Sequence, residues 1–326
     1  MTTRLAWGIL GTGHIAGQFA AGLNASERCH LAAVGSRQLE TARPFAARHA
    51  ISAVHDTYDA LLADPAVRAV YVSLPNGLHH EWTVKALRAG KHVLCEKPLA
   101  SNFAQAQEMF DVARQTGLVL AEAFMYRSHP LTHAIQQAVA DGRIGQLKVI
   151  RTSFLFAAEK IEGNVRFDPA LAGGSLMDVG CYCLSYARLF ARGEPQSLLA
   201  CGHLHSTGVD DYVAGAMAFS GGIVSSFACG ITVRADNTAQ LHGTTGYILV
   251  PLPWKPPATD AAYILIDKDG GHHTTLVSAN KHLYALEADE FAATILDGTP
   301  QRVTEADSLG NQRCLDVLRR QVGVAF

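Results

Sequence analysis

The sequence predicts an α/β protein in which a doubly wound parallel sheet is followed by a second α/β domain with an open, mostly antiparallel sheet. The first part is indicated by short apolar runs that alternate with helical patterns, and by a glycine-rich turn, GTGHIA, at the first strand–helix junction. The second part is indicated by longer strand-like runs with few helices between them. A length of 326 residues is typical of two domains, and we place these at 1–125 and 126–326.

The elements of the first domain follow from hydrophobic periodicity. Apolar runs without polar alternation predict strands that are buried on both faces of a parallel sheet. We expect these strands at 5–10, 30–36, 69–74, 92–96 and 118–124. Helical spacing of apolar residues predicts helices between them, at 13–25, 39–48, 80–89 and 103–116.

The second domain is expected to begin with a bridging helix at 129–141 and to continue as a sheet. Its strand-like runs are KVIRTSFLF, VAGAMAF, IVSSFACGITV, AQLHGTTGYILV and AYILID. The turn SGG (220–222) between two of them is a hairpin signal. Two helices, at 282–296 and 305–322, are expected to close the chain.

Composition argues against several classes of function. The formal net charge is −2 and no basic run is present, so we expect no nucleic-acid or membrane partner. No apolar stretch reaches the roughly 20 residues of a membrane span, and the N-terminus lacks a signal-peptide pattern, so we expect a cytoplasmic protein. The seven cysteines are expected to be reduced, and no metal-ligand set is evident.

The turn GTGHIA gives Gly11-x-Gly13 between a strand and a helix, the context that dinucleotide binding requires. Gly11 permits the tight turn, and Gly13 lets a pyrophosphate approach the backbone. Main-chain N–H groups at the helix start, from Thr12 through His14 to Ile15, then hold the phosphates. The alternative is a purely structural turn.

The second strand ends in Gly35-Ser36-Arg37, where a dinucleotide-binding fold reads the adenosine ribose. An acidic residue there would bind a 2′-hydroxyl. Ser36 and Arg37 instead offer a hydroxyl and a guanidinium, which suit a 2′-phosphate. We therefore expect NADP rather than NAD. Alternatively, Arg37 is merely solvated or stacks on the adenine.

The third strand ends in SLPNGLHH, at the carboxyl edge of the sheet where ligands of doubly wound folds bind. Leu74, Pro75 and Asn76 are expected to face the cofactor. His79 either faces the cofactor as well or caps its own helix, and the sequence leaves both open.

The order of the glycine fingerprint, PNGLHH (75–80) and GKHVLCEKPLA (90–100) resembles the glucose–fructose oxidoreductase / inositol dehydrogenase family, often called Gfo/Idh/MocA. The resemblance covers nearly the whole chain, and its most specific mark is the EKP at 96–98. It implies a Rossmann domain followed by an open-sheet α/β domain. It also implies a cis peptide bond between Lys97 and Pro98.

A second mark of this family lies at AGGSLMDVGCYCLSYARLF (172–190), which carries a glycine pair, then Asp178, then Tyr182. Inositol dehydrogenases have His where Tyr182 stands. The Tyr form is similar to the branch of glucose–fructose oxidoreductase, NADP-dependent D-xylose dehydrogenases and dimeric dihydrodiol dehydrogenases. The stretches AEAFMYRSHP (121–130) and NVRFDPALAGG (164–174) are similar to the same branch.

Oxidising a secondary alcohol requires a hydride acceptor and a base, and Tyr182 is the candidate base. A free phenol has a pKa of about 10, and a neighbouring ammonium lowers it. Lys97 can supply that charge and can also contact the sugar hydroxyl or the nicotinamide ribose. Asp178 precedes Tyr182 by one helical turn, so both side chains can share a face and a substrate. The alternative for Asp178 is an N-cap.

For four further side chains the sequence leaves alternative roles open. Glu96 either positions Lys97, contacts the nicotinamide, or forms only a structural ion pair. Arg127 is a candidate for a substrate oxygen or carboxylate. Trp254 is either an aromatic wall for a sugar ring or part of the core. Arg166 flanks the glycine pair, and the sequence does not say whether it faces a ligand.

Taken together, we expect an enzyme that transfers a hydride between NADP and a sugar or polyol, for example an aldose such as D-xylose or D-glucose. The alternatives are a trans-dihydrodiol dehydrogenase, a keto-sugar reductase, or a non-catalytic NADP sensor. The resemblance also implies a homodimer that pairs through the exposed face of the second-domain sheet.

Overall fold

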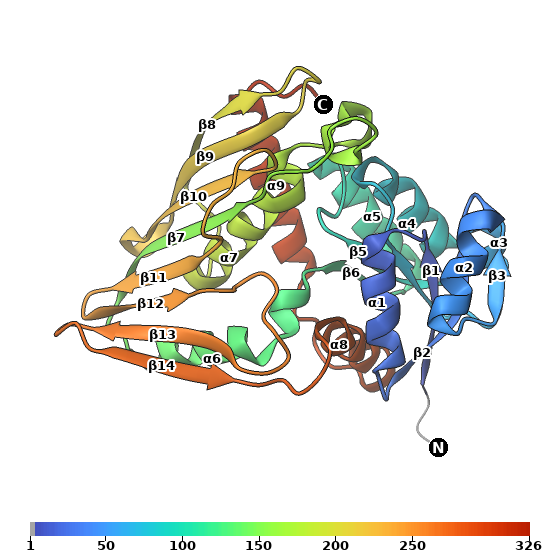
Figure 1. Cartoon of the computed structure of the whole chain (residues 1–326), viewed down its shortest axis with the longest axis horizontal. Helices are drawn as coiled ribbons and strands as arrows, with labels where there is room; N and C mark the ends of the chain where they lie inside the picture. The colour runs from blue at the N-terminus through green and yellow to red at the C-terminus, as the bar shows by residue number, and fades with distance from the viewer. Residues whose placement is uncertain (1–3) are drawn as a thin grey trace. The chain divides into compact units, whose positions relative to one another are not determined.

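A computed structural model describes residues 4–326 and divides the chain into two compact units. The first unit contains the residues up to Ser128 together with Lys281–Ser308. Its centre is a parallel sheet of six strands in the order β3-β2-β1-β4-β5-β6 (Figure 1). The strands are β1 (Leu5–Leu10), β2 (Cys29–Gly35), β3 (Ala53–His55), β4 (Ala69–Val72), β5 (His92–Glu96) and β6 (Leu120–Ala123).

Helices connect these strands, as the alternating pattern predicts. They are α1 (His14–Asn24), α2 (Leu39–His49), α3 (Tyr58–Ala63), α4 (His79–Arg88) and α5 (Phe103–Thr116). The strand order reverses at β1, which has β2 on one side and β4 on the other. A doubly wound sheet binds its ligand at the carboxyl ends of the strands beside such a switch point. The predicted doubly wound fold is thus confirmed.

The two units differ from the predicted domains in one respect, because Lys281–Ser308 belong to the first unit. This segment carries α8 (Leu283–Asp297), which packs against α1. The approach is so close that a Cβ on Gly22 would lie 2.7 Å from the carbonyl carbon of Tyr284. Phe291 of α8 also meets the ring of Trp7 at 5.2 Å between centroids. The apolar stripe of α8 therefore completes the core of the first unit.

The second unit contains His129–Asn280 and Leu309–Phe326. Its sheet has eight strands in the order β14-β13-β12-β11-β7-β10-β9-β8. Every neighbouring pair is antiparallel except β7–β10, which is parallel. The predicted open, mostly antiparallel sheet is thus confirmed. The strands are β7 (Leu147–Leu155), β8 (Ser197–Leu204), β9 (Asp210–Ala218), β10 (Val224–Gly230), β11 (Ala239–Gly243), β12 (Gly246–Val250), β13 (Ala261–Asp267) and β14 (His272–Val277).

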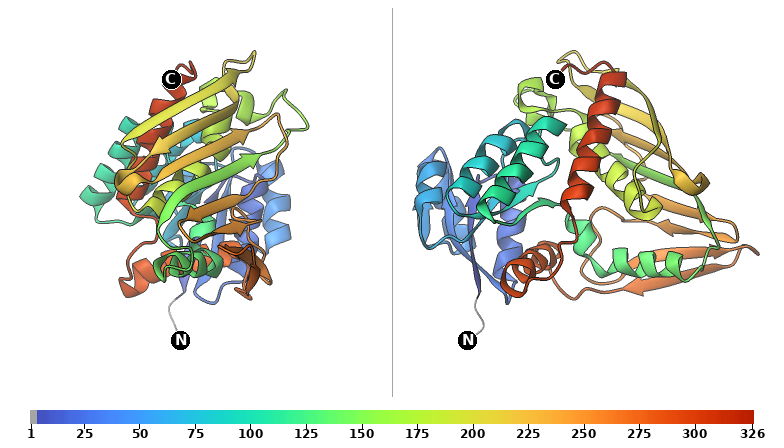
Figure 2. Two further views of the ribbon diagram at one scale, coloured as in Figure 1. Left: turned by 90° about the vertical axis from the view of Figure 1, so that its left-hand side faces the viewer. Right: turned by 180° about the vertical axis from the view of Figure 1, so that it is seen from behind.

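Helices cover one face of this sheet and leave the other open (Figures 1 and 2). The covering helices are α6 (Pro130–Ala140) and α7 (Cys181–Ala191), and α9 (Glu305–Gln321) closes the chain. The strand register places four exposed apolar side chains on the opposite face, which we call the outer face: Leu199, Tyr212, Val224 and Leu276. In the described part of the chain, no helix is long and apolar enough to cross a membrane.

Candidate active site

The glycine turn of the first unit has the geometry that a dinucleotide phosphate requires. Gly11 has a φ of +100°, a left-handed conformation that other residues adopt only with strain. Its N–H donates to the carbonyl of Gly35 at 2.9 Å, which fixes the turn. A Cβ built on Gly13 would meet no atom within 4 Å, so there is open space at the first turn of α1. The residues present therefore fit a bound pyrophosphate at this helix start.

The end of β2 is followed by Ser36 and Arg37, the residues predicted to read the adenosine ribose. Arg37 is exposed, and Ser36 is buried with its hydroxyl 3.0 Å from that of Thr41. Burial raises the pKa of the Tyr58 phenol, and the nearby Arg37 guanidinium opposes part of that rise. The Arg37 guanidinium therefore lies near Tyr58, the first residue of α3, and Arg37 is exposed to solvent.

His79 joins two loops at the carboxyl edge of the sheet. Its ring is fully buried, with Nδ1 2.8 Å from the carbonyl of Pro98 and Nε2 2.8 Å from the carbonyl of Leu74. An imidazolium could donate to both carbonyls, but burial opposes the charge and lowers the pKa of His79 to about 4. The alternative that His79 caps its own helix is wrong, because no side chain caps α4. Its contact with the cofactor stays a prediction.

This histidine should make stability depend on pH. A folded pKa of about 4 against 6.5 in the unfolded chain means that the unfolded state binds more protons below neutral pH. We expect His79 to remove about 2 kcal/mol of unfolding free energy between pH 8 and pH 5. Urea unfolding of a His79→Asn variant should therefore show a shallower loss over this range than the wild type. Parallel losses in the two proteins would contradict the assignment.

The end of β5 holds Glu96 and Lys97 in fixed positions. Glu96 is buried and accepts hydrogen bonds from the hydroxyl of Tyr71 and from the N–H of Lys97, the latter at 3.3 Å. Tyr71 itself stacks on Phe19 at 3.8 Å. The peptide bond between Lys97 and Pro98 is cis, which confirms the expectation from the family resemblance. Lys97 is partly exposed and directly follows the carboxyl end of β5.

Sequence reasoning missed a second carboxyl group at this place. Glu287 of α8 is buried, and burial followed by the charge of Glu96 raises its pKa well above the usual range. Two carboxyl groups in one buried region favour a single shared negative charge. Glu96 has two hydrogen-bond donors, so the ionised form is disfavoured more strongly at Glu287. Its position inside the apolar stripe of Tyr284 and Phe291 was the available signal.

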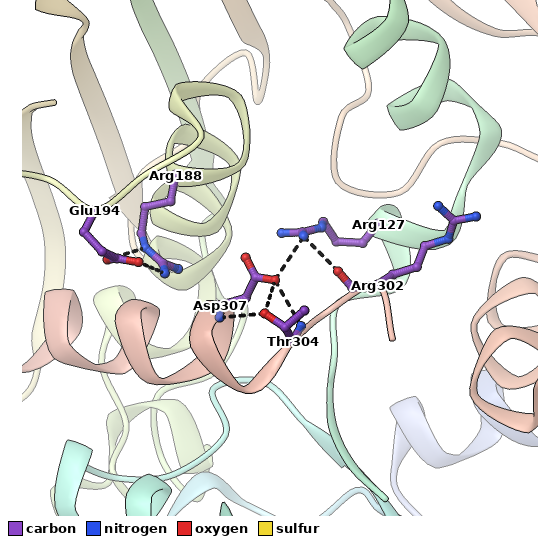
Figure 3. A network of polar contacts seen from close by, with 6 residues as sticks. All are labelled: Arg127, Arg188, Glu194, Arg302, Thr304 and Asp307. Carbon is purple, nitrogen blue, oxygen red and sulfur yellow. Dashed lines mark hydrogen bonds and ion pairs between the residues drawn. The ribbon is translucent and has the colours of Figure 1, made fainter. Parts of the chain in front are cut away.

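Arg127 is engaged within the first unit. It lies in the short helix η2 (Met125–Ser128) and is buried. Figure 3 shows its guanidinium donating to the carbonyl of Arg302 at 3.0 Å, with the carboxylate of Asp307 at 3.5 Å. Asp307 in turn accepts from Thr304 at 2.9 Å. These contacts give Arg127 a structural role, and its contact with substrate stays a prediction.

The second unit carries Asp178 and Tyr182 on one helical run. Asp178 lies in a π-helical turn, η5 (Leu176–Gly180), and Tyr182 follows in α7. The N-cap of α7 is Gly180, so the alternative that Asp178 acts only as a cap is wrong. Asp178 instead accepts a hydrogen bond from Nε of Arg166 at 2.6 Å. Such π-turns occur frequently at functional sites.

The glycine pair before this run is required by close packing. A Cβ on Gly173 would lie 2.4 Å from the carbonyl oxygen of Arg166. The same carbonyl accepts from the N–H of Gly174 at 2.8 Å. The backbone of Arg166 therefore packs directly against the glycine pair. This packing places the Arg166 side chain where its guanidinium can donate to Asp178. Sequence reasoning had left the role of Arg166 open.

Aromatic rings surround Tyr182. The ring of Phe154 lies 5.3 Å from it and that of Trp254 lies 6.0 Å away, both edge-on. Trp254 is buried, stacks on Phe154 and donates to the carbonyl of Ser153 at 2.9 Å. These contacts agree with the alternative that Trp254 is part of the core. A contact between Trp254 and a sugar ring stays a prediction. The contacts with Phe154 and Trp254 help to bury the Tyr182 side chain, which is 3% exposed.

No metal site is found: residues 4–326 contain no group of three or more His, Cys, Asp or Glu side chains that could hold an ion. Within residues 4–326 the seven cysteines form no disulfide, and all except Cys201 are buried. The candidate side chains for the chemistry are Lys97 in the first unit and the Asp178–Tyr182 pair in the second, and their roles stay predictions. The glycine turn and the doubly wound sheet of the first unit are those of a domain that binds NAD(P).

Comparison with known proteins identifies the family. The model of an oxidoreductase family with an NAD-binding Rossmann fold, GFO_IDH_MocA, matches residues 5–124, and that of the GFO/IDH/MocA C-terminal domain matches 132–249. The chain belongs to the Gfo/Idh/MocA family.

Relatives include the human trans-1,2-dihydrobenzene-1,2-diol dehydrogenase, 36% identical over 77% of this chain and 76% of that protein. The D-xylose 1-dehydrogenase (NADP(+)) 2 of Haloferax volcanii is 33% identical over 96% of this chain and 95% of its own length. Among solved structures, KijD10, a 3-ketoreductase from Actinomadura kijaniata in complex with NADP and TDP-benzene, has a TM-score of 0.91. It is 30% identical and the match covers 98% of each chain.

Proposed function

We propose that this chain is an NADP-dependent dehydrogenase that transfers a hydride between NADP and the C–OH carbon of a sugar, an aldose such as D-xylose or D-glucose. The observation that carries the proposal is Tyr182, a buried phenol one turn after Asp178 on a glycine-preceded helix. The names of the relatives support the class, since they include an NADP-dependent D-xylose dehydrogenase.

The roles of the residues follow from their chemistry. The nicotinamide of the bound cofactor supplies the hydride acceptor or donor. Tyr182 takes the hydroxyl proton during oxidation and returns it during reduction. The proposal requires the Lys97 ammonium to act on the same substrate, where it lowers the phenol pKa. Asp178, held by Arg166, accepts a hydrogen bond from a second substrate hydroxyl. Glu96 fixes the main chain at Lys97.

A panel of substrates tests the assignment. Purified protein with NADP should increase absorbance at the nicotinamide wavelength with at least one of D-xylose and D-glucose. A response confined to trans-dihydrodiols, or with NADPH to dicarbonyls or keto-sugars, would replace the aldose assignment with one of those activities. No response to any of them, together with tight NADP binding, would favour a non-catalytic NADP sensor. The presence of Lys97, Asp178 and Tyr182 argues against a sensor.

The cofactor preference rests on Arg37 and has its own test. Arg37→Ala should raise the KM for NADP by about 10- to 100-fold, because a charged hydrogen bond to the 2′-phosphate contributes about 1.5–3 kcal/mol. The KM for NAD should change less than about twofold, since NAD lacks that phosphate. Arg43→Ala, at an exposed site on α2, controls for the loss of positive charge. Equal effects on both cofactors would contradict the 2′-phosphate assignment.

We also propose a homodimer that pairs through the outer face of the second unit. Leu199, Tyr212, Val224 and Leu276 expose apolar surface there, on strands that form one open sheet face. Apolar side chains spread over one face are typical of surfaces that bury against a partner. Sedimentation velocity should show a dimer, and a monomer at micromolar concentration would contradict this assembly.

A further inference from the structure

A carboxylate from a strand that is distant in sequence caps the start of the helical run that contains Asp178 and Tyr182. Asp210, the first residue of β9, is fully buried. Its Oδ2 accepts the hydroxyl of Ser175 at 2.7 Å and the N–H of Leu176 at 2.7 Å. These donors lie at the first turn of the run, where backbone N–H groups lack helical partners. Asp210 therefore caps this turn from another element.

The same carboxylate also fixes the turn sterically. Gly174 has a φ of +112°, and a Cβ built on it would lie 2.3 Å from Oδ1 of Asp210. The carbonyl of Gly174 accepts from the N–H of Asp178 at 2.9 Å. One short chain of contacts thus leads from Asp210 through Gly174 to the main chain of Asp178. A shift of the carboxylate would be passed to Asp178 and on to Tyr182, one turn later.

This arrangement is costly, which argues that it serves more than stability. Burial raises the pKa of Asp210 to about 6, while the bonds from Ser175 and Leu176 and the charge of Arg319 oppose the rise. Oδ1 is buried and has no hydrogen-bond partner among the described residues. A serine or threonine within the helix start could cap the turn without burying a charge. Costly local arrangements are concentrated where function requires a fixed geometry.

We propose that Asp210 is a positioning residue that sets the placement of Asp178 and Tyr182 for hydride-transfer chemistry. The inference rests on the proposed function of this pair, but its geometric part does not. The side chain of Asp210 contacts Ser175, Leu176 and Gly174, which precede Asp178 and Tyr182 in the same run. It acts by anchoring residues 174–182 to the sheet.

Hydrogen exchange followed by mass spectrometry tests the geometric part without any substrate. In Asp210→Ala, peptides that cover residues 174–182 should exchange at least 10-fold faster than in the wild type. Asp211→Ala is the matched control: Asp211 is also buried on β9, but its side chain binds His203 and Thr232, which lie outside this run. The control should leave exchange at 174–182 unchanged.

Kinetics test the functional part. Asp210→Ala should lower kcat at least 10-fold and leave the KM for NADP within about twofold, where kcat is expressed per NADP-binding site counted by fluorescence titration, so that a loss of folded protein does not enter the value. Asp210→Asn should restore most of kcat, because its amide oxygen can accept both hydrogen bonds. Should the alanine variant not fold, Ser175→Ala removes one of the two bonds and should show a smaller loss in the same direction.

The two proposals fail in different ways. Wild-type exchange at 174–182 in both Asp210→Ala and Ser175→Ala would overturn the role of Asp210, whatever the enzyme turns over. Faster exchange with unchanged kcat would also overturn it. Faster exchange in a protein whose wild type oxidises no sugar would leave the anchoring of the helix intact and reject the proposed function instead.

Discussion

Tyr182→Phe should lower kcat by about 10²- to 10⁴-fold, the usual contribution of one general acid–base group. Phenylalanine keeps the ring and its contacts with Phe154 and Trp254, so the fold should be preserved. Only the hydroxyl that exchanges the proton is lost. Steady-state kinetics with the substrate identified in the panel give kcat, and fluorescence titration gives the NADP dissociation constant, which should change less than about twofold.

The chain offers a matched control for this variant. Tyr186 lies one turn further along α7, is buried, and also meets Trp254 edge-on at 5.6 Å. Tyr186→Phe removes a buried phenol from the same helix without touching the proposed acid–base group, so its kcat should fall by less than about threefold. Comparable losses in the two variants would remove Tyr182 from its role.

Under the proposed mechanism, Lys97→Met should also lose about 10²-fold or more in kcat, because it removes the ammonium that we propose favours the phenolate and keeps the aliphatic stem. The pH profile should distinguish this role from simple substrate binding. If Lys97 acts on Tyr182 as proposed, its loss raises the phenol pKa, so activity in the oxidation direction should reach its plateau at a higher pH than in the wild type. Measurement of kcat from pH 6 to pH 10 gives both quantities.

Lys85→Met provides the control for Lys97, since Lys85 is an exposed lysine on α4 that pairs with Glu81. It should leave kcat and its pH profile unchanged. An unshifted profile in Lys97→Met, with only the substrate KM raised, would assign Lys97 to substrate binding and separate it from the acid–base step.

Much of the fold could be predicted from the sequence because its core strands are short, apolar and separated by clear helical patterns. The predicted strand and helix bounds at 5–10, 92–96 and 103–116 coincide with β1, β5 and α5. The missed elements are shorter or sit at sheet edges: β3, α3, β8 and β14. β14, with the sequence HHTTLV, has one neighbouring strand and lacks the apolar run that buried strands show.

Candidate site residues could be predicted from the sequence only where they belong to a short local motif. Gly11, Lys97, Asp178 and Tyr182 stand in short signatures whose neighbours fix their geometry. Asp210 was not predictable, and for Glu287 the sequence showed only a carboxyl residue inside an apolar stripe, because each reaches its place through packing between elements that are distant in sequence. Asp210, for example, binds Ser175 across 35 residues, and no local pattern marks such a pair.

The central claim is that a hydride passes between a sugar carbon and NADP, and isotope transfer measures this most directly. The aldose identified in the panel, deuterated at C1, is incubated with the enzyme and NADP, and the reduced cofactor is analysed by mass spectrometry. We predict one deuterium in the nicotinamide ring per turnover. Reduced cofactor without deuterium from C1 would contradict the proposed reaction, as would oxidised sugar without reduced cofactor.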